Sequence, residues 1–117
     1  MIGDVKDKTC IIVDDMTDTS GTLVKAAAEL KKKGASRVFA FITHGIFSGP
    51  AAERIADSEI EAVVCTDTMM QDDKTLRIMG DKLQYVSIDL FLAEIIRRTV
   101  NHESKEELFE IPLYKHM

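Results

Sequence analysis

IIVDDMTDTSGT, residues 11–22, is the stretch of sequence that decides the fold. The apolar run 10–13 is typical of a short strand buried on both faces of a sheet. Two carboxylates, Asp14 and Asp15, follow this run, and a polar loop over 16–22 leads into a segment with helical spacing of apolar residues. Strand, acidic pair, hydroxyl-rich loop and helix start, in this order, predict a binding site at the carboxyl end of a parallel strand.

The groups in this loop suit a phosphate. Backbone N–H groups and the dipole at a helix start favour an anion, and the threonine and serine hydroxyls over 17–22 can donate hydrogen bonds to it. Asp14 and Asp15 cannot be phosphate ligands, but they can accept hydrogen bonds from sugar hydroxyls or hold a hard cation. A sugar phosphate satisfies both halves of the predicted site.

The rest of the chain alternates between apolar runs and helical patterns. Further strands are expected at 37–43, 60–66 and 83–88. Helices are expected from 20 or 21 to 33, over 48–55 with Ser48 as the cap, and from 87 or 89 onward, with short helical turns within 68–81 and 103–108. Gly34 is the expected stop of the first helix, because glycine tolerates a left-handed backbone. This alternation predicts an α/β fold, a parallel sheet with flanking helices.

Several polar side chains follow the predicted strands and are expected to gather at one edge of the sheet. His44, which comes directly before Gly45, has the chemistry of an acid–base group or metal ligand, but an anchoring role in its loop is favoured. The residues expected at this edge are Asp14, Asp15, His44, Asp67 and Asp89.

Length and composition limit the class of protein. A chain of 117 residues predicts a single domain over 1–117. Net charge of −5 argues against nucleic-acid binding, and no apolar run reaches the ~18–20 residues of a membrane span. The first residues, MIGDVKDK, do not resemble a signal peptide. Cys10 and Cys65 lie in apolar runs and are expected to be buried, reduced thiols, which favours a cytoplasmic protein.

Three segments of the sequence resemble a known family. VDDMTDTSGT, residues 13–22, resembles the phosphoribosyl pyrophosphate-binding loop of type I phosphoribosyltransferases. THGIFSGP at 43–50 and AEIIRRT at 93–99 resemble later segments of ribose-phosphate pyrophosphokinase, also called phosphoribosyl pyrophosphate synthetase. The similarity runs over nearly the whole chain. A complete synthetase is much longer, so the resemblance is to its C-terminal part, a truncated type I phosphoribosyltransferase-like fold.

This resemblance implies an activity. The family transfers diphosphate from ATP to ribose 5-phosphate, giving phosphoribosyl pyrophosphate and AMP, with magnesium as cofactor. The implied partners are ribose 5-phosphate, ATP through an upstream region, and further copies of the chain in a homo-oligomer. The ATP-binding residues, a metal-binding histidine and a basic catalytic loop of the family lie upstream of the matched segments. We therefore expect this chain alone to be inactive.

The resemblance also implies roles for individual residues. Asp14 and Asp15 hold the ribose hydroxyls, and no residue is implied as a metal ligand. Since a carboxylate is a poor phosphate ligand, the backbone N–H of Asp18 is the expected phosphate contact, and its carboxylate is expected to brace the loop. The inhibitory nucleotide site of the family implies roles for Ser104 and Phe109. The residues that wrap the 5-phosphate are Asp18, Thr19, Ser20, Gly21 and Thr22.

Three other classes of protein share features with this sequence. A receiver domain also places an acidic pair after its first strand, but it needs a fifth strand ending in Lys-Pro, and this sequence contains no Lys-Pro. A phosphoribosyltransferase uses the same loop, but it should be longer upstream of the loop and should lack the two later segments. A non-catalytic regulatory subunit related to the synthetase usually has an altered loop, whereas the loop here is intact.

Overall fold

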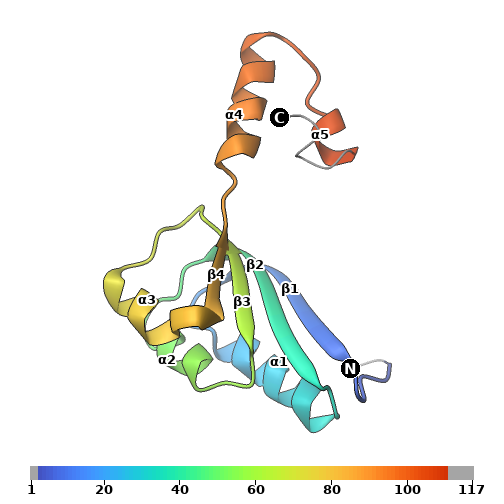
Figure 1. Ribbon diagram of the computed structural model, residues 1–117, viewed down its shortest axis with the longest axis vertical. Coiled ribbons are helices and arrows are strands. Elements are labelled where there is room, and N and C mark those ends of the chain that lie inside the picture. Colours follow the sequence, from blue (N-terminus) through green and yellow to red (C-terminus); the bar gives the residue numbers. More distant parts are fainter. Residues whose placement is uncertain (1–2, 111–117) are drawn as a thin grey trace. The chain divides into compact units, whose positions relative to one another are not determined.

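The computed structural model describes residues 3–110, which divide into two compact units after Val86. The first unit is a four-stranded sheet whose strands are connected by helices (Figure 1), as the α/β prediction requires. Its elements are β1 (Thr9–Thr17), α1 (Gly21–Lys32), β2 (Arg37–Gly45), α2 (Ala51–Ala56), β3 (Ala62–Thr66), α3 (Asp73–Met79), a 3-10 turn η1 (Gly80–Lys82) and β4 (Leu83–Val86).

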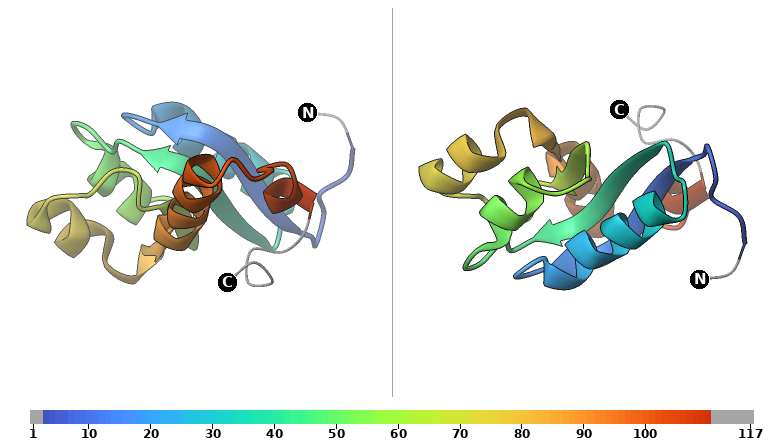
Figure 2. Two further views of the ribbon diagram at one scale, coloured as in Figure 1. Left: turned by 90° about the horizontal axis from the view of Figure 1, so that it is seen from above. Right: turned by 90° about the horizontal axis from the view of Figure 1, so that it is seen from below.

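The strands lie in the order β1-β2-β3-β4, and each pair is parallel. Each crossover therefore steps one strand in the same direction. Right-handed crossovers that all step one way place their helices on the same face of a sheet. Figure 2 shows α1 and α2 on one side of the strands. The fold is thus one layer of helices on one layer of sheet.

The core lies between these two layers. Alternate side chains of a strand point to opposite faces, and on β2 the buried residues Val38, Ala40 and Ile42 face the helices. Val63 and Cys65 on β3 continue this row. The helices contribute Leu23 and Ala27 from α1, Ala51, Ala52 and Ile55 from α2, and Met79 from α3.

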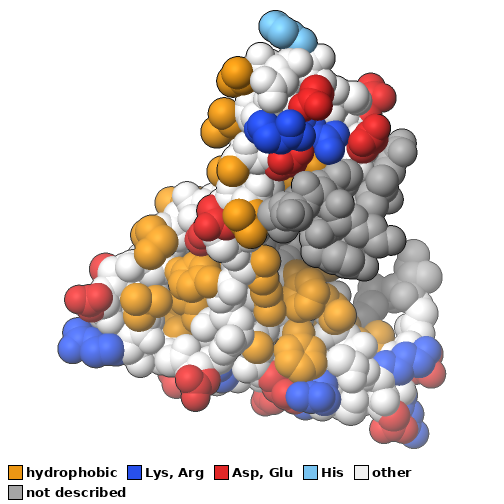
Figure 3. Space-filling view, turned by 45° about the horizontal axis from the view of Figure 1, so that its top comes forward, with side chains coloured by type: hydrophobic (Ala, Val, Ile, Leu, Met, Phe, Trp, Pro, Cys, Tyr) orange, Lys and Arg blue, Asp and Glu red, His pale blue; other side chains and the backbone are white. Residues whose placement is uncertain are grey.

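The other face of the sheet is open, so the prediction of a first strand buried on both faces is wrong. Ile11 is 53% exposed and Val13 is 76% exposed. Phe41 and Val86, on β2 and β4, are 45% and 54% exposed. Figure 3 shows hydrophobic side chains gathered over the strands. The apolar run 10–13 looked like a doubly covered strand because both rows of its side chains are apolar, although only one row faces the helices of the first unit.

Strands β1 and β2 are longer than predicted. β1 continues past Val13 to Thr17 because its polar end stays in register with β2. Asp14 pairs with Ile42, and Thr17 pairs with Gly45. Aspartate has a low intrinsic preference for strands, but here pairing with β2 keeps the aspartates in the strand. The acidic pair therefore lies within β1, not after it.

The start of α2 also differs from the prediction. The helix begins at Ala51 with Pro50 as its N-cap residue, and no side chain caps it. Ser48 lies further upstream, and its hydroxyl donates to the carboxylate of Asp18 instead. The serine that local sequence predicts as the helix cap therefore makes a tertiary contact instead.

Single residues confirm or adjust other local predictions, and one cap was not predicted from the sequence. Gly34 follows α1 with φ of +99°, the left-handed conformation expected of a helix stop. Asp72 caps α3 by accepting a hydrogen bond from the Thr75 amide at 2.8 Å, and this bond lowers the pKa of Asp72. Cys65 is buried, and burial raises its pKa to about 11. Cys10 is only half-buried, because β1 lies at the edge of the sheet.

Lys82 fixes the carboxyl end of α2. Its ammonium group is half-buried and donates to three backbone carbonyls, at 3.2, 3.0 and 3.0 Å. A cation at this end also complements the helix dipole. The three acceptors are the carbonyl oxygens of Ile55, Ala56 and Ser58.

Replacing this lysine should weaken the first unit. We expect Lys82→Met to lower the free energy of unfolding by about 2 kcal/mol, because three carbonyls lose a charged donor while the aliphatic stem is kept. Urea unfolding measures the change. Lys25→Met, the same substitution at an exposed position of α1, serves as the control and should change stability by less than about 0.5 kcal/mol. Equal losses of stability in the two variants would contradict the role of Lys82 in holding the end of α2.

The second unit holds α4 (Asp89–Val100) and α5 (Glu107–Glu110). Glu94 is buried and accepts hydrogen bonds from Arg97 and Arg98, which hold its pKa at about 2. Arg98 also donates to the carbonyl oxygen of Ser104 at 2.7 Å, tying α4 to the following loop. Among the described residues, no helix combines the length and the apolar character needed to cross a bilayer.

Candidate functional site

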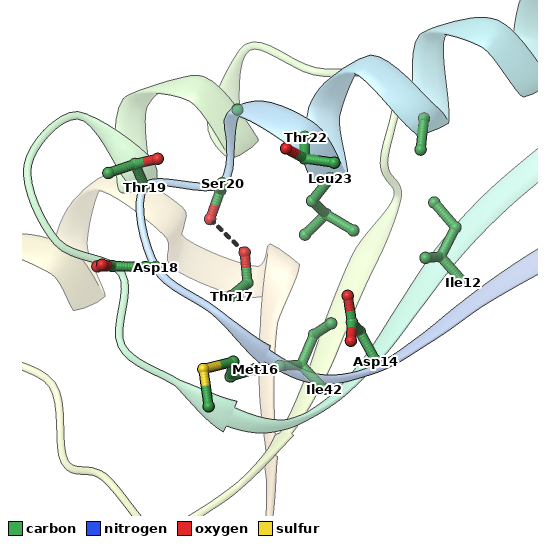
Figure 4. Close-up of a pocket in the computed structure, with 12 residues that line it drawn as sticks. Ile12, Asp14, Met16, Thr17, Asp18, Thr19, Ser20, Thr22, Leu23 and Ile42 are labelled. Atoms are coloured by element: carbon green, nitrogen blue, oxygen red, sulfur yellow. Dashed lines mark hydrogen bonds between the residues drawn. The ribbon is translucent and has the colours of Figure 1, made fainter.

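The loop between β1 and α1 is closed by a hydrogen bond between two hydroxyls. Thr17, the last residue of β1, and Ser20, just before α1, are both buried. Their side-chain oxygens lie 2.9 Å apart (Figure 4). Two buried hydroxyls that satisfy each other fix the distance between the end of the strand and the start of the helix.

The backbone of this loop is shaped to present N–H groups. Ser20 has φ of +64°, a left-handed conformation that is uncommon for residues other than glycine. The Val24 amide donates to the Ser20 carbonyl at 3.0 Å and so begins the helical pattern. The N–H groups of the first helical turn have no acceptor within a helix. Left-handed residues next to such a turn form concave backbone sites that favour anions.

A hollow of about 390 Å³ lies beside this loop. Its volume falls in the ~300–1,000 Å³ range of small-molecule sites. The loop residues predicted to wrap a phosphate all line it, together with one of the two predicted carboxylates. The lining residues are Ile12, Asp14, Met16, Thr17, Asp18, Thr19, Ser20, Gly21, Thr22, Leu23, Ala26 and Ile42.

The two adjacent carboxylates are placed differently. Because both lie inside β1, their side chains point to opposite faces of the sheet. Asp14 lies between Ile12 and Ile42 in the wall of the hollow (Figure 4). Asp15 is not among the lining residues, and its amide donates to the Asp14 carboxylate at 2.8 Å. The structure therefore brings Asp14, but not Asp15, together with the loop predicted to bind phosphate.

Asp18 is held by the loop that follows β2. The amide of Ser48 donates to the Asp18 carbonyl at 3.0 Å, and the Ser48 hydroxyl donates to the Asp18 carboxylate. The Ile46 amide donates to the carbonyl of Thr17 at 3.0 Å. The segment after β2 thus supports the β1–α1 loop through these hydrogen bonds. In this geometry the Asp18 carboxylate braces the loop.

Arg54 was not among the residues predicted for the site. It extends from α2, and its Nη1 donates to the Thr19 carbonyl at 3.1 Å. Between Thr9 and Val24 the sequence contains no lysine or arginine, so the fold brings a cation to an acidic segment. A lone arginine in the helix sequence AAERIA carries no signal of this contact, which depends on how α2 packs.

The remaining candidates are not among the residues that line the hollow. His44 Nδ1 is 2.7 Å from the Thr68 hydroxyl, which is the anchoring role favoured from sequence. Asp67 directly follows β3, and Asp89 begins α4 in the second unit. Within residues 3–110, no group of three or more histidine, cysteine or acidic side chains is arranged to hold a metal ion.

The predicted inhibitory nucleotide site falls on the second unit. Ser104 uses its carbonyl for Arg98, and its hydroxyl accepts from the Glu106 amide at 3.3 Å. The side chain of Phe109 lies outside the described part of the chain. The roles of these two residues stay predictions.

Comparisons with known proteins agree with the resemblance seen in the sequence. The family described as phosphoribosyl synthetase-associated domain matches residues 1–110. The crystal structure of phosphoribosylpyrophosphate synthetase from Mycobacterium smegmatis superposes with a TM-score of 0.81 at 38% sequence identity. The match covers 86% of this chain and 33% of that chain. The present chain therefore spans about a third of the length of that synthetase.

Proposed function

Because the chain belongs to the phosphoribosyl synthetase-associated domain family, we propose that it is the ribose 5-phosphate-binding part of a ribose-phosphate pyrophosphokinase. That enzyme transfers diphosphate from ATP to ribose 5-phosphate and yields phosphoribosyl pyrophosphate and AMP. The observation that carries the proposal is a single hollow that contains both Asp14 and the loop of Thr19, Ser20, Gly21 and Thr22. Carboxylate and phosphate loop together suit the two ends of a sugar phosphate.

In the proposed complex, the phosphate lies on the N–H groups and hydroxyls of Thr19 to Thr22. The Asp14 carboxylate accepts hydrogen bonds from ribose hydroxyls and orients the sugar. Catalysis of phosphoryl transfer depends mainly on positioning and on neutralising phosphate charge. Since the chain matches only a third of the solved synthetase, we propose that polypeptide outside this third provides the ATP site and the catalytic cations.

Magnesium is proposed to arrive with the substrate phosphates. Mg²⁺ in phosphate-transfer enzymes is usually bound by one or two carboxylates together with phosphate oxygens and water. Asp14 is a carboxylate in the hollow, and this donor set fits a magnesium ion that the substrate mainly holds. When bound, the ion supplies neutralisation of phosphate charge.

A second candidate is a non-catalytic subunit that binds the sugar phosphate and associates with a synthetase. The family description, a synthetase-associated domain, favours it. Both candidates use the same hollow and differ only in whether the assembled protein forms AMP. A phosphoribosyltransferase is not favoured, because the structural match is to a synthetase.

Titrations followed by NMR test the shared site. Inorganic phosphate and ribose 5-phosphate should both shift the amides of Thr19 to Thr22 first. We expect Asp14→Asn to weaken ribose 5-phosphate binding about tenfold, since it removes a charged acceptor of the sugar hydroxyls. The affinity for inorganic phosphate should not fall, because Asp14 is proposed to contact only the sugar.

Asp15→Asn provides the matched control, because it makes the same charge change on the other face of β1. Its effect on ribose 5-phosphate should be smaller than that of Asp14→Asn. Largest shifts around Ser48 or Ser104, in place of the loop, would contradict the proposed site.

A further inference from the structure

Arg54 donates a hydrogen bond to Thr19 in the β1–α1 loop and lies close to Gly21. Its Nη1 lies 3.1 Å from the carbonyl oxygen of Thr19. A methyl group added at Gly21 would lie 3.3 Å from the same nitrogen and 3.9 Å from the guanidinium carbon. The guanidinium therefore lies against the turn that joins Thr19 to the first residue of α1.

This contact is made from outside the hollow. Thr19, Ser20 and Gly21 line the hollow, whereas Arg54 is not among its lining residues. In a trans peptide, the carbonyl oxygen and the following N–H point in opposite directions. The N–H of Ser20 therefore points away from Arg54. A cation on the Thr19 carbonyl polarises this peptide group and makes the Ser20 N–H a stronger donor.

The charge of Arg54 also matters to the loop. Asp14, Asp15 and Asp18 place three carboxylates in a segment without a lysine or arginine of its own. These negative charges oppose the approach of a phosphate. A guanidinium held beside the loop offsets part of this repulsion.

We propose that Arg54 is a positioning residue of the anion site, acting through the Thr19 carbonyl on the backbone donors of the loop. The role rests on the proposed function of this loop as a phosphate site. It extends that function by assigning the cation to α2, a helix distant in sequence from the loop. The helix α2 thereby influences phosphate affinity without contacting the phosphate.

Inorganic phosphate titrations of three variants test the proposal. Arg54→Gln should weaken phosphate binding about tenfold, the loss expected for one charge-assisted hydrogen bond. Arg54→Lys should recover most of this loss, to within about threefold of the unsubstituted chain, because the charge is kept but the planar fork is lost. Arg77→Gln removes an equal charge from the exposed surface of α3 and should leave affinity unchanged.

A second readout requires no ligand. In the free protein, Arg54→Gln should move the Ser20 amide proton resonance upfield, because the N–H is no longer polarised by a cation on the Thr19 carbonyl. The midpoint of thermal unfolding should change by no more than a few degrees. An unmoved Ser20 amide, or equal phosphate affinity of Arg54→Gln and Arg77→Gln, would overturn the role of Arg54 alone. Failure of the unsubstituted chain to bind phosphate would overturn the proposed function and this role with it.

Discussion

Gly45→Ala is expected to destabilise the first unit by about 3 kcal/mol, at the upper end of the cost of overpacking a core. Gly45 is the buried last residue of β2. A methyl group there would lie 2.7 Å from Cζ of Phe47 and 3.0 Å from Sγ of Cys65. Phe47 is itself only 4% exposed, so its ring has no free space to enter. Urea unfolding of the variant measures the loss.

Gly21→Ala is the matched control for this substitution. Its added methyl group would meet only the end of the flexible Arg54 side chain, at 3.3 Å, and alanine favours the helix that begins there. Its stability should therefore change by less than about 1 kcal/mol. If Gly45→Ala were equally mild, the tight packing of Phe47 against Gly45 would be contradicted.

The double variant Gly45→Ala/Phe47→Ala identifies the cause. Phe47→Ala alone should cost about 3 kcal/mol or more, because it leaves a cavity. In the double variant the new methyl group fills part of that cavity, so the combined loss should be clearly smaller than the sum of the single losses. Additive losses would mean that Gly45 is required for another reason.

Self-association through the sheet is the second large effect that we expect. Among residues 3–110, β1 pairs only with β2 and so forms an edge of the described sheet. It carries unpaired backbone groups beside the exposed side chains of Ile11 and Val13. Proteins usually protect such edges with charge, proline or a covering element. At micromolar concentrations the chain should sediment as dimers or larger species, as expected for edge pairing or burial of this open face.

Val13→Lys should shift this equilibrium strongly toward the monomer. Val13 is 76% exposed, so a lysine can be accommodated without loss of the core. Val100→Lys makes the same substitution on α4, where Val100 is 70% exposed, and should have little effect. If Val100→Lys disrupted the association more than Val13→Lys, the association would lie on α4 instead. A stable monomer of the unsubstituted chain would contradict the prediction.

Local signals in the sequence were sufficient for the framework of the fold. Alternating apolar runs and helical spacing predicted the strands and helices of the parallel sheet. The left-handed stop at Gly34 and the loop leading into α1 follow from the chemistry of the residues at those positions. These features depend on neighbours within a few residues, which a single sequence contains.

Contacts between distant segments were not predictable in the same way. The continuation of β1 through Asp14 depends on pairing with Ile42, and it decides which carboxylate faces the hollow. Ser48 looked like a helix cap but bonds Asp18, and Arg54 reaches Thr19 from another helix. Each of these contacts depends on tertiary packing that overrides local preference.

The strand order β1-β2-β3-β4 has a consequence for how the chain is made. Each of β2, β3 and β4 pairs with the strand that precedes it in the sequence, so none of these pairings depends on a segment made later. A nascent chain leaves the ribosome from its N-terminus. It can add each strand and its helix to a sheet already formed, and the short loops closed at each step favour fast folding. Because the sheet grows from β1 toward β4, the β1–α1 loop and the segment that supports it can assemble before α3 and β4 are synthesised.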